Sequence, residues 1–156
     1  MVALHDRRRE DNEATNPADP DVTTRVVLDT NVALALLLFA DPQLTGLAAR
    51  WTAGDIEAIV DGETLDEFDR VLGYPELRLD AGAAALISFD YRARCTLVAI
   101  TAPHAPLPRC RDPDDQKFLR LAQRSDARWL LTRDKALLEL RDRMSFRIAL
   151  PEKLVL

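Results

Sequence analysis

The chain has 156 residues, 47% of them apolar and 30% charged, and a formal net charge of −5 at pH 7. This length fits one domain with a hydrophobic core, and no apolar run approaches the roughly 18 residues that a membrane-spanning helix needs. Two cysteines, Cys95 and Cys110, make neither a disulfide framework nor a metal-binding pattern. The simplest location is the cytoplasm. The negative charge argues only weakly against a nucleic-acid partner, because bound cations would neutralise carboxylates at a metal site.

Residues 1–24 are polar and lack an apolar period, so we expect a flexible arm there, followed by one domain over residues 25–156. Strands are expected at 26–28, 56–60, 96–100, 128–132 and 146–150. Helices are expected at 30–39, 43–53, 64–72, 81–92, 113–124 and 135–140. The segment 101–111 contains three prolines and is expected to be a surface loop. Strands that alternate with helices predict an α/β fold with a mainly parallel sheet.

Four acidic residues fall at strand ends or in the first turns of helices, where an open parallel sheet builds its sites. They are Asp29, Glu67, Asp115 and Asp134. Converging carboxylates repel one another strongly, so a cluster of this kind indicates a divalent cation. We therefore expect the four side chains to converge at the carboxyl edge of the sheet.

The two acids at strand ends also have structural interpretations. Asp29 could simply cap the following helix. Thr30 or Asn31 could serve as that cap instead, which would leave Asp29 free. Asp134 follows another apolar strand, and Thr132 is placed two residues earlier to orient a carboxylate or bind water.

The roles of the two acids within helices depend on which way each side chain faces. Glu67 could return to the backbone of Thr64 in a capping box, or it could face a cleft from the edge of its helix. Asp112 looks like the cap of the next helix, and Asp114 is expected to be solvated. Asp115 should share the buried face of that helix, because apolar residues follow it at +3, +4 and +7: Phe118, Leu119 and Ala122.

Three segments of the chain resemble the PIN-domain nucleases, a family that includes the VapC-type toxins of bacterial toxin–antitoxin systems. They are VVLDTNV at 26–32, CRDPDDQKFLRLA at 110–122 and LLTRDKALL at 130–138. The similarity covers about residues 25–153. It implies a three-layer α/β/α fold and hydrolysis of RNA that depends on Mg²⁺ or Mn²⁺, with a 5′-phosphate and a 3′-hydroxyl as the ends produced.

The resemblance also implies which side chains form the site. The metal-binding and catalytic acids would be Asp29, Glu67, Asp115 and Asp134. The third acid can be aligned with Asp115 or with position 116, where Gln116 could not serve, and the helical facing favours Asp115.

Other positions would support the acids or contact the substrate. Asn31, Thr132 and Asp112 would have supporting roles, and Arg111 and Arg133 would bind substrate. Arg133 stands where this branch of the family often has glycine, so we expect a more crowded or more basic site mouth.

The expected partners are an RNA substrate, an antitoxin protein and a second copy of the chain. An aspartyl-phosphate phosphatase would need a second aspartate two residues after Asp29, where Asn31 stands. A phosphoacceptor signalling domain would need a lysine at a late strand end, and Thr132-Arg133 offers none. A third alternative is a catalytically inactive PIN-like scaffold or RNA-binding domain. The presence of all four acids argues against it.

Overall fold

The computed structural model describes residues 23–99 and 105–154. Most of the arm expected at 1–24 lies outside these residues, although Thr24 belongs to the first strand. The last residue of the strand expected at 96–100 and the first four of the loop at 101–111 also lie outside them. The rest of that loop, from 105 to 111, contains no helix or strand.

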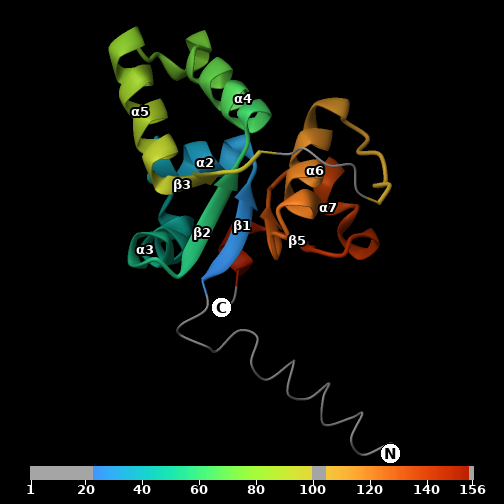
Figure 1. Ribbon diagram of the computed structural model, residues 1–156. Coiled ribbons are helices and arrows are strands. Elements are labelled where there is room, and N and C mark those ends of the chain that lie inside the picture. Colours follow the sequence, from blue (N-terminus) through green and yellow to red (C-terminus); the bar gives the residue numbers. More distant parts are fainter. Residues whose placement is uncertain (1–22, 100–104, 155–156) are drawn as a thin grey trace, which may run out of the picture.

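A parallel sheet of five strands forms the middle of the domain (Figure 1). The strands are β1 (Thr24–Leu28), β2 (Ile56–Val60), β3 (Cys95–Leu97), β4 (Trp129–Leu131) and β5 (Arg147–Ala149). Their order is β3-β2-β1-β4-β5, and every pairing is parallel, which confirms the expected sheet. The sheet grows in one direction from β1 to β3 and in the other through β4 and β5. Open α/β sheets bind ligands at the carboxyl ends of strands beside such a reversal, here β1 and β4.

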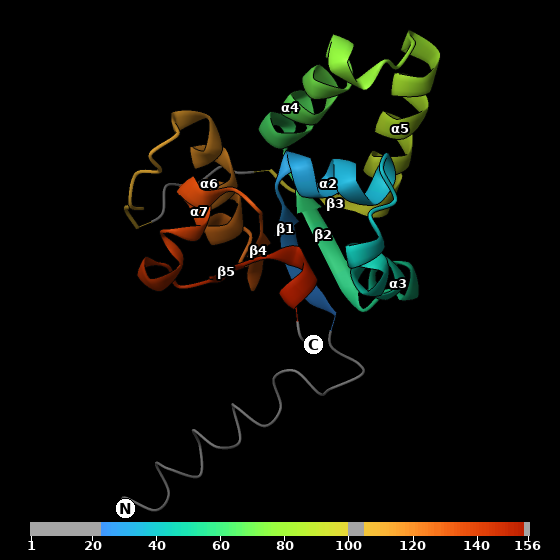
Figure 2. The same ribbon diagram turned by 180° about the vertical axis from the view of Figure 1, so that it is seen from behind.

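Helices cover both faces of the sheet, so the fold has the three layers that the resemblance implied (Figures 1 and 2). One core cluster packs the sheet against α2 (Thr30–Leu37), α3 (Thr45–Ala53), α4 (Gly62–Leu72) and α5 (Ala81–Arg94). The other packs it against α6 (Gln116–Arg124) and α7 (Lys135–Leu138). Successive β1 residues alternate between the two clusters, with Val26 and Leu28 in the first and Val27 in the second. This is the two-residue period of a strand buried on both faces.

Two helices begin differently from the sequence-based expectation, and both differences affect the site. The helix expected from Thr64 begins at Gly62, because Asp61 accepts a hydrogen bond from the Thr64 backbone and Thr64 Oγ1 accepts one from the Asp61 backbone. The capping box is therefore formed by Asp61 and Thr64, and of the two alternatives for Glu67 the structure shows the one in which it faces a cleft. The helix expected from Pro113 divides into a 3₁₀ turn, η3 (Pro113–Asp115), and α6.

Within the described ranges, no single helix is long and apolar enough to cross a bilayer. One bent pair, Thr30–Leu37 with Pro42–Ala53, has sufficient length and apolar composition, but the two parts meet at 96°.

Candidate functional site

A cleft of about 440 Å³ opens where the carboxyl ends of β1 and β4 meet the helices that follow them. Its lining comes from the start and end of α2, from α4, from the turn before α6 and from the turn after β4. All four acids expected at the site are among the lining residues: Asp29, Glu67, Asp115 and Asp134. The fold therefore brings together side chains that are spread over more than one hundred positions of the chain.

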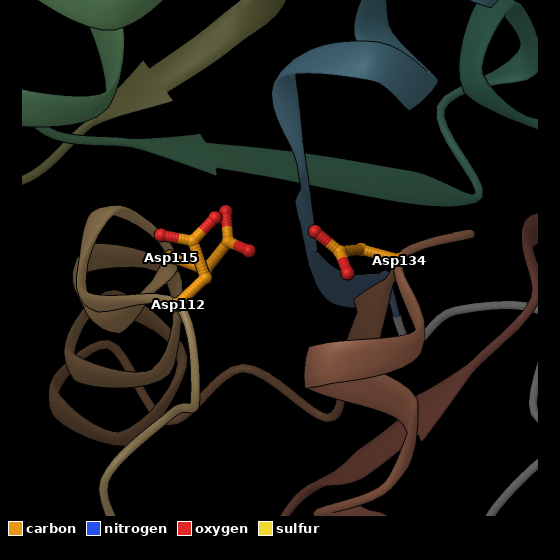
Figure 3. A group of neighbouring side chains, drawn as sticks. All are labelled: Asp112, Asp115 and Asp134. Carbon is orange, nitrogen blue, oxygen red and sulfur yellow. The ribbon is translucent and has the colours of Figure 1, made fainter.

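Three carboxylates make a close group in this cleft, and one of them, Asp112, was expected to cap a helix and to support the site rather than to bind metal. Asp112, Asp115 and Asp134 each place one oxygen within 4.8 Å of the other two. Figure 3 shows Asp112 and Asp115 projecting from the turn before α6, with Asp134 directed toward them from the turn after β4. Oxygen ligands around a hard divalent cation lie at about 2.0–2.6 Å from it, so two ligands of one ion are separated by this kind of distance.

The turn before α6 carries both Asp112 and Asp115. The Asp115 backbone N–H donates a 3.2 Å hydrogen bond to the Asp112 carbonyl, which closes the turn between the two residues. Asp112 also acts as a cap, because its Oδ1 accepts a hydrogen bond of 3.0 Å from the Asp114 backbone. The sequence signal of a cap therefore conceals the place of Asp112 beside Asp115 and Asp134. Asp114 is exposed, as expected, although it also lines the cleft.

Asp115 has the electrostatic environment of an incomplete cation site. The residue is half-buried, and its Oδ2 is buried without a hydrogen-bond partner among the described residues. Burial is the main cause that raises the Asp115 pKa to about 8, followed by the hydrogen bond with Asp134 and the charges of Asp134, Asp112 and Asp29. A cation would supply the missing partner for Oδ2 and reverse the repulsion. The donor set is made only of carboxylate oxygens, so these residues fit Mg²⁺ or Mn²⁺.

Asp29 lies under this group and is fixed by donors from the protein. It is buried, and its Oδ1 accepts a 2.9 Å hydrogen bond from the Val32 backbone, so Asp29 itself caps α2 rather than Thr30 or Asn31. Its Oδ2 accepts a hydrogen bond from Thr132 Oγ1. Burial raises the pKa of Asp29, whereas the bonds from Thr132 and Val32 lower it.

Thr132 connects Asp29 with the turn that carries Asp134. Its side chain is fully buried, and Oγ1 both donates to Asp29 and accepts a 3.0 Å hydrogen bond from the Asp134 backbone. The expected role of Thr132 in orienting a carboxylate matches this geometry. Asn31, the other expected supporting residue, is exposed and lines the cleft.

Glu67 lies in the same cleft but is held by cations of the protein. Its side chain is 11% exposed and accepts hydrogen bonds from Thr30 Oγ1 and, at 2.8 Å, from Lys117 Nζ. Arg70 Nη2 lies 3.7 Å from the same carboxylate. Glu67 is not part of the close group, and it would have to exchange Lys117 for an ion in order to bind metal. Its role as a metal ligand stays a prediction.

The two arginines expected to bind substrate are not among the described residues that line the cleft. Arg133 donates to Asp41 at 2.8 Å and to Glu152 at 3.3 Å, and Arg111 lies 3.4 Å from Glu139. These acids come from distant parts of the sequence and hold the guanidinium groups elsewhere. The structure therefore does not support the more basic site mouth expected from Arg133.

A three-layer fold with an all-parallel sheet and carboxylates grouped at its reversal point defines an α/β domain with a candidate cation site at the carboxyl edge of the sheet. The sequence model of the PIN domain family matches residues 25–136, and the chain belongs to this family. PIN domains are generally nucleases that use divalent metals. No curated protein matches the chain.

Proposed function

We propose that this protein is an endoribonuclease that depends on Mg²⁺ or Mn²⁺ and acts as the toxin of a toxin–antitoxin pair. The observation that carries the proposal is the group of Asp112, Asp115 and Asp134, each of which places one oxygen within 4.8 Å of the other two, and the buried Oδ2 of Asp115 has no hydrogen-bond partner among the residues that the structure describes. A protein that needed these acids only for stability would not place like charges so close together without compensation.

The residues of the site divide into those that would bind the cation and those that hold them in place. Asp112, Asp115 and Asp134 would provide its oxygen ligands. When bound, such a cation makes a coordinated water more acidic and neutralises charge that develops on a scissile phosphate. Thr132 ties the backbone of Asp134 to Asp29, so the ligand group is held at the sheet edge before the ion arrives. Asp29 and Glu67 complete the predicted set of catalytic acids.

One observation favours the alternative of a catalytically inactive domain. The ion pair between Lys117 and Glu67 occupies a carboxylate that the active form is predicted to use. In an inactive scaffold this pair would be permanent, whereas in a nuclease it would open or Glu67 would act only by positioning its neighbours. Cleavage by the wild-type chain decides between these two functions.

The test is cleavage of a pool of structured RNAs by metal-stripped protein to which Mn²⁺, Mg²⁺ or EDTA is added. We expect cleavage only with the metals, 5′-phosphate and 3′-hydroxyl ends, and loss of cleavage in Asp115→Asn. The matched control is Asp114→Asn, which changes an adjacent exposed acid of the same charge. Cleavage that persists in EDTA, or that survives Asp115→Asn, would overturn the metal mechanism, and no cleavage by the wild type would favour the scaffold.

The toxin role is tested by expression in a bacterial host. We expect the wild-type chain to arrest growth, Asp115→Asn to be harmless, and co-expression of a short antitoxin-like reading frame from beside the gene to restore growth. The proposal includes a homodimer, which sedimentation of the purified chain checks, and a cytoplasmic location, where the RNA is found. Normal growth with active wild-type protein would show a ribonuclease that is not a toxin.

A further inference from the structure

The cleft has an aromatic part that the acidic group does not explain. Five large hydrophobic side chains are exposed among the described residues: Phe39, Tyr74, Leu86, Phe89 and Leu97. Of these, Phe39 and Tyr74 line the cleft, with exposed fractions of 60% and 44%. Exposed aromatic rings in a cleft leave their faces available to a ligand, and their location there calls for a reason.

The two rings lie at the far ends of the helices that form the cleft wall. Phe39 follows the last turn of α2, whose first turn is capped by Asp29, and α2 is about 12 Å long at 1.5 Å per residue. Tyr74 follows the end of α4 in the same way. Leu34, Val71 and Leu77 line the cleft beside these helix ends. Along α2, Phe39 is therefore separated from Asp29 by about the length of this helix.

The charge of the cleft explains why a nucleic acid would need these rings. Its lining contains seven carboxylates: Asp29, Glu67, Glu76, Asp112, Asp114, Asp115 and Asp134. Arg70 is the one lysine or arginine among the described residues of this lining. One or two divalent ions would neutralise only part of this charge, so a polyanion cannot be held by charge alone. Stacking of bases on aromatic faces provides affinity that is independent of positive charge.

We propose that Phe39 and Tyr74 form a nucleobase-binding subsite, in which bases near the cleaved phosphodiester stack on the two rings. The inference rests on the proposed ribonuclease function and extends it to the residues that recognise the strand. At about 3.4 Å per stacked nucleotide, the length of α2 corresponds to roughly three nucleotides between the acids and Phe39. The side chain of Arg70 is 60% exposed and can contact a phosphate of the same strand.

A base fits this place better than a protein partner does. A protein interface has an apolar centre with few charges, whereas Phe39 and Tyr74 share their cleft with carboxylates. A more apolar exposed face lies elsewhere, on α5, where Leu86 and Phe89 are three positions apart and 72% and 73% exposed.

The test uses an RNA that the wild-type chain cleaves and a series of the same RNA in which one base at a time is removed. Phe39→Ala and Tyr74→Ala are compared with the wild type at saturating Mn²⁺, and Phe39→Tyr and Tyr74→Phe keep an aromatic ring. Leu86→Ala and Phe89→Ala are the controls, because they shorten even more exposed apolar side chains outside the cleft lining. Thermal unfolding of each variant confirms that it is folded.

We expect each alanine variant to lose roughly 5- to 150-fold in kcat/KM, which corresponds to the loss of one stacked base. Removing the base that stacks on Phe39 should slow the wild type to a similar extent and leave Phe39→Ala almost unaffected. The aromatic replacements should restore most of the kcat/KM that the alanine variants lose, and both controls should cleave as the wild type does.

Equal cleavage by all variants would overturn the subsite while leaving the ribonuclease function intact. Alanine variants that cleave normally but no longer bind the antitoxin would show that the rings contact a protein. If the wild type cleaves no RNA at all, the proposed function fails, and this inference fails with it.

Discussion

Asp115 sits in a position that an ordinary aspartate avoids. Its Oδ2 is buried without a donor from the described residues, and Asp112 and Asp134 stand beside it. Such a carboxylate has two ways to relieve the repulsion, by taking up a proton or by binding a cation. The stability of the folded protein should therefore depend on both pH and bound metal through this side chain.

Asp115 should lose its proton as the pH rises, and this loss should make the metal-free protein less stable. Its pKa is raised from 3.8 to about 8, chiefly by burial, so the folded state binds the proton more tightly than the unfolded state. The resulting stability is complete below about pH 4 and is lost as the pH rises through about 8. Urea unfolding in EDTA across this window should show a decline that Asp115→Asn lacks. A constant difference between the two proteins would show that Asp115 titrates normally.

Substitutions of three neighbouring aspartates should differ in their effect on the affinity for Mn²⁺. We expect Asp112→Asn and Asp115→Asn each to weaken Mn²⁺ binding by more than about 10-fold, because both remove an oxygen from the close group. Asp114→Asn should leave Mn²⁺ binding nearly unchanged, because its side chain is outside the close group. Calorimetric titration of the metal-stripped variants measures this. Unchanged Mn²⁺ binding by Asp112→Asn would show that Asp112 only caps the turn before α6.

At the scale of single elements, the sequence predicted where helices and strands occur better than how they begin. The strand at 56–60 was predicted to the residue, because its apolar run is bounded by turns. The helix was expected from Thr64, yet α4 begins two residues earlier at Gly62, since the Asp61 side chain caps it through the Thr64 backbone. Asp112 was missed as a candidate ligand because its sequence signal is that of a cap, and its closeness to Asp134 arises only in the folded chain.

The cap of α4 can be tested directly. Asp61→Ala should lower the free energy of unfolding by about 0.5–2 kcal/mol, because the Thr64 backbone loses its acceptor. Asp61→Asn keeps an acceptor oxygen and should lose much less. Urea denaturation of the two variants makes the comparison, and an equal loss in both would mean that the charge of Asp61, rather than its cap, stabilises the helix.

The ion pair between Glu67 of α4 and Lys117 of α6 should stabilise the fold and weaken metal binding. Lys117 and Glu67 are each 11% exposed, and Lys117→Met should cost about 1.5–3 kcal/mol by leaving Glu67 without its main partner. The same change frees Glu67, so Mn²⁺ should bind more tightly if Glu67 is a ligand. The double variant with Glu67→Gln should lose less stability than the sum of the single changes. Lower stability without tighter metal binding would indicate that Glu67 is structural.

For the whole molecule, the alternation of strands and helices was sufficient to predict a parallel α/β fold and one shared cleft. The order of strands was not predicted, because β1 pairs with β4 across about a hundred residues and no local pattern records this. Arg133 was assigned to the substrate for the same reason. Its partners, Asp41 and Glu152, lie far from it in sequence and become neighbours only in the folded chain.

Metal binding should stabilise the whole domain. At Mn²⁺ concentrations about 100 times the Kd, the folded state gains about 2.7 kcal/mol, which corresponds to a Tm increase of roughly 5–10 °C for a chain of this size. The gain should disappear in Asp115→Asn and Asp134→Asn, whereas Asp114→Asn should keep it. Differential scanning calorimetry with and without Mn²⁺ provides the measurement, and a shift of equal size in every variant would place the ion elsewhere.

The hydrogen bond between Thr132 and Asp29 joins residues 103 positions apart, and this separation sets the order of events during synthesis. Translation proceeds at about 5–20 residues per second, so roughly 5–20 s pass between the two residues. During that time a nascent chain has β1 and Asp29 but lacks β4, Thr132 and Asp134. The acidic group cannot assemble before its last member is made, so a partly synthesised copy carries no completed metal site near the ribosome that produces it.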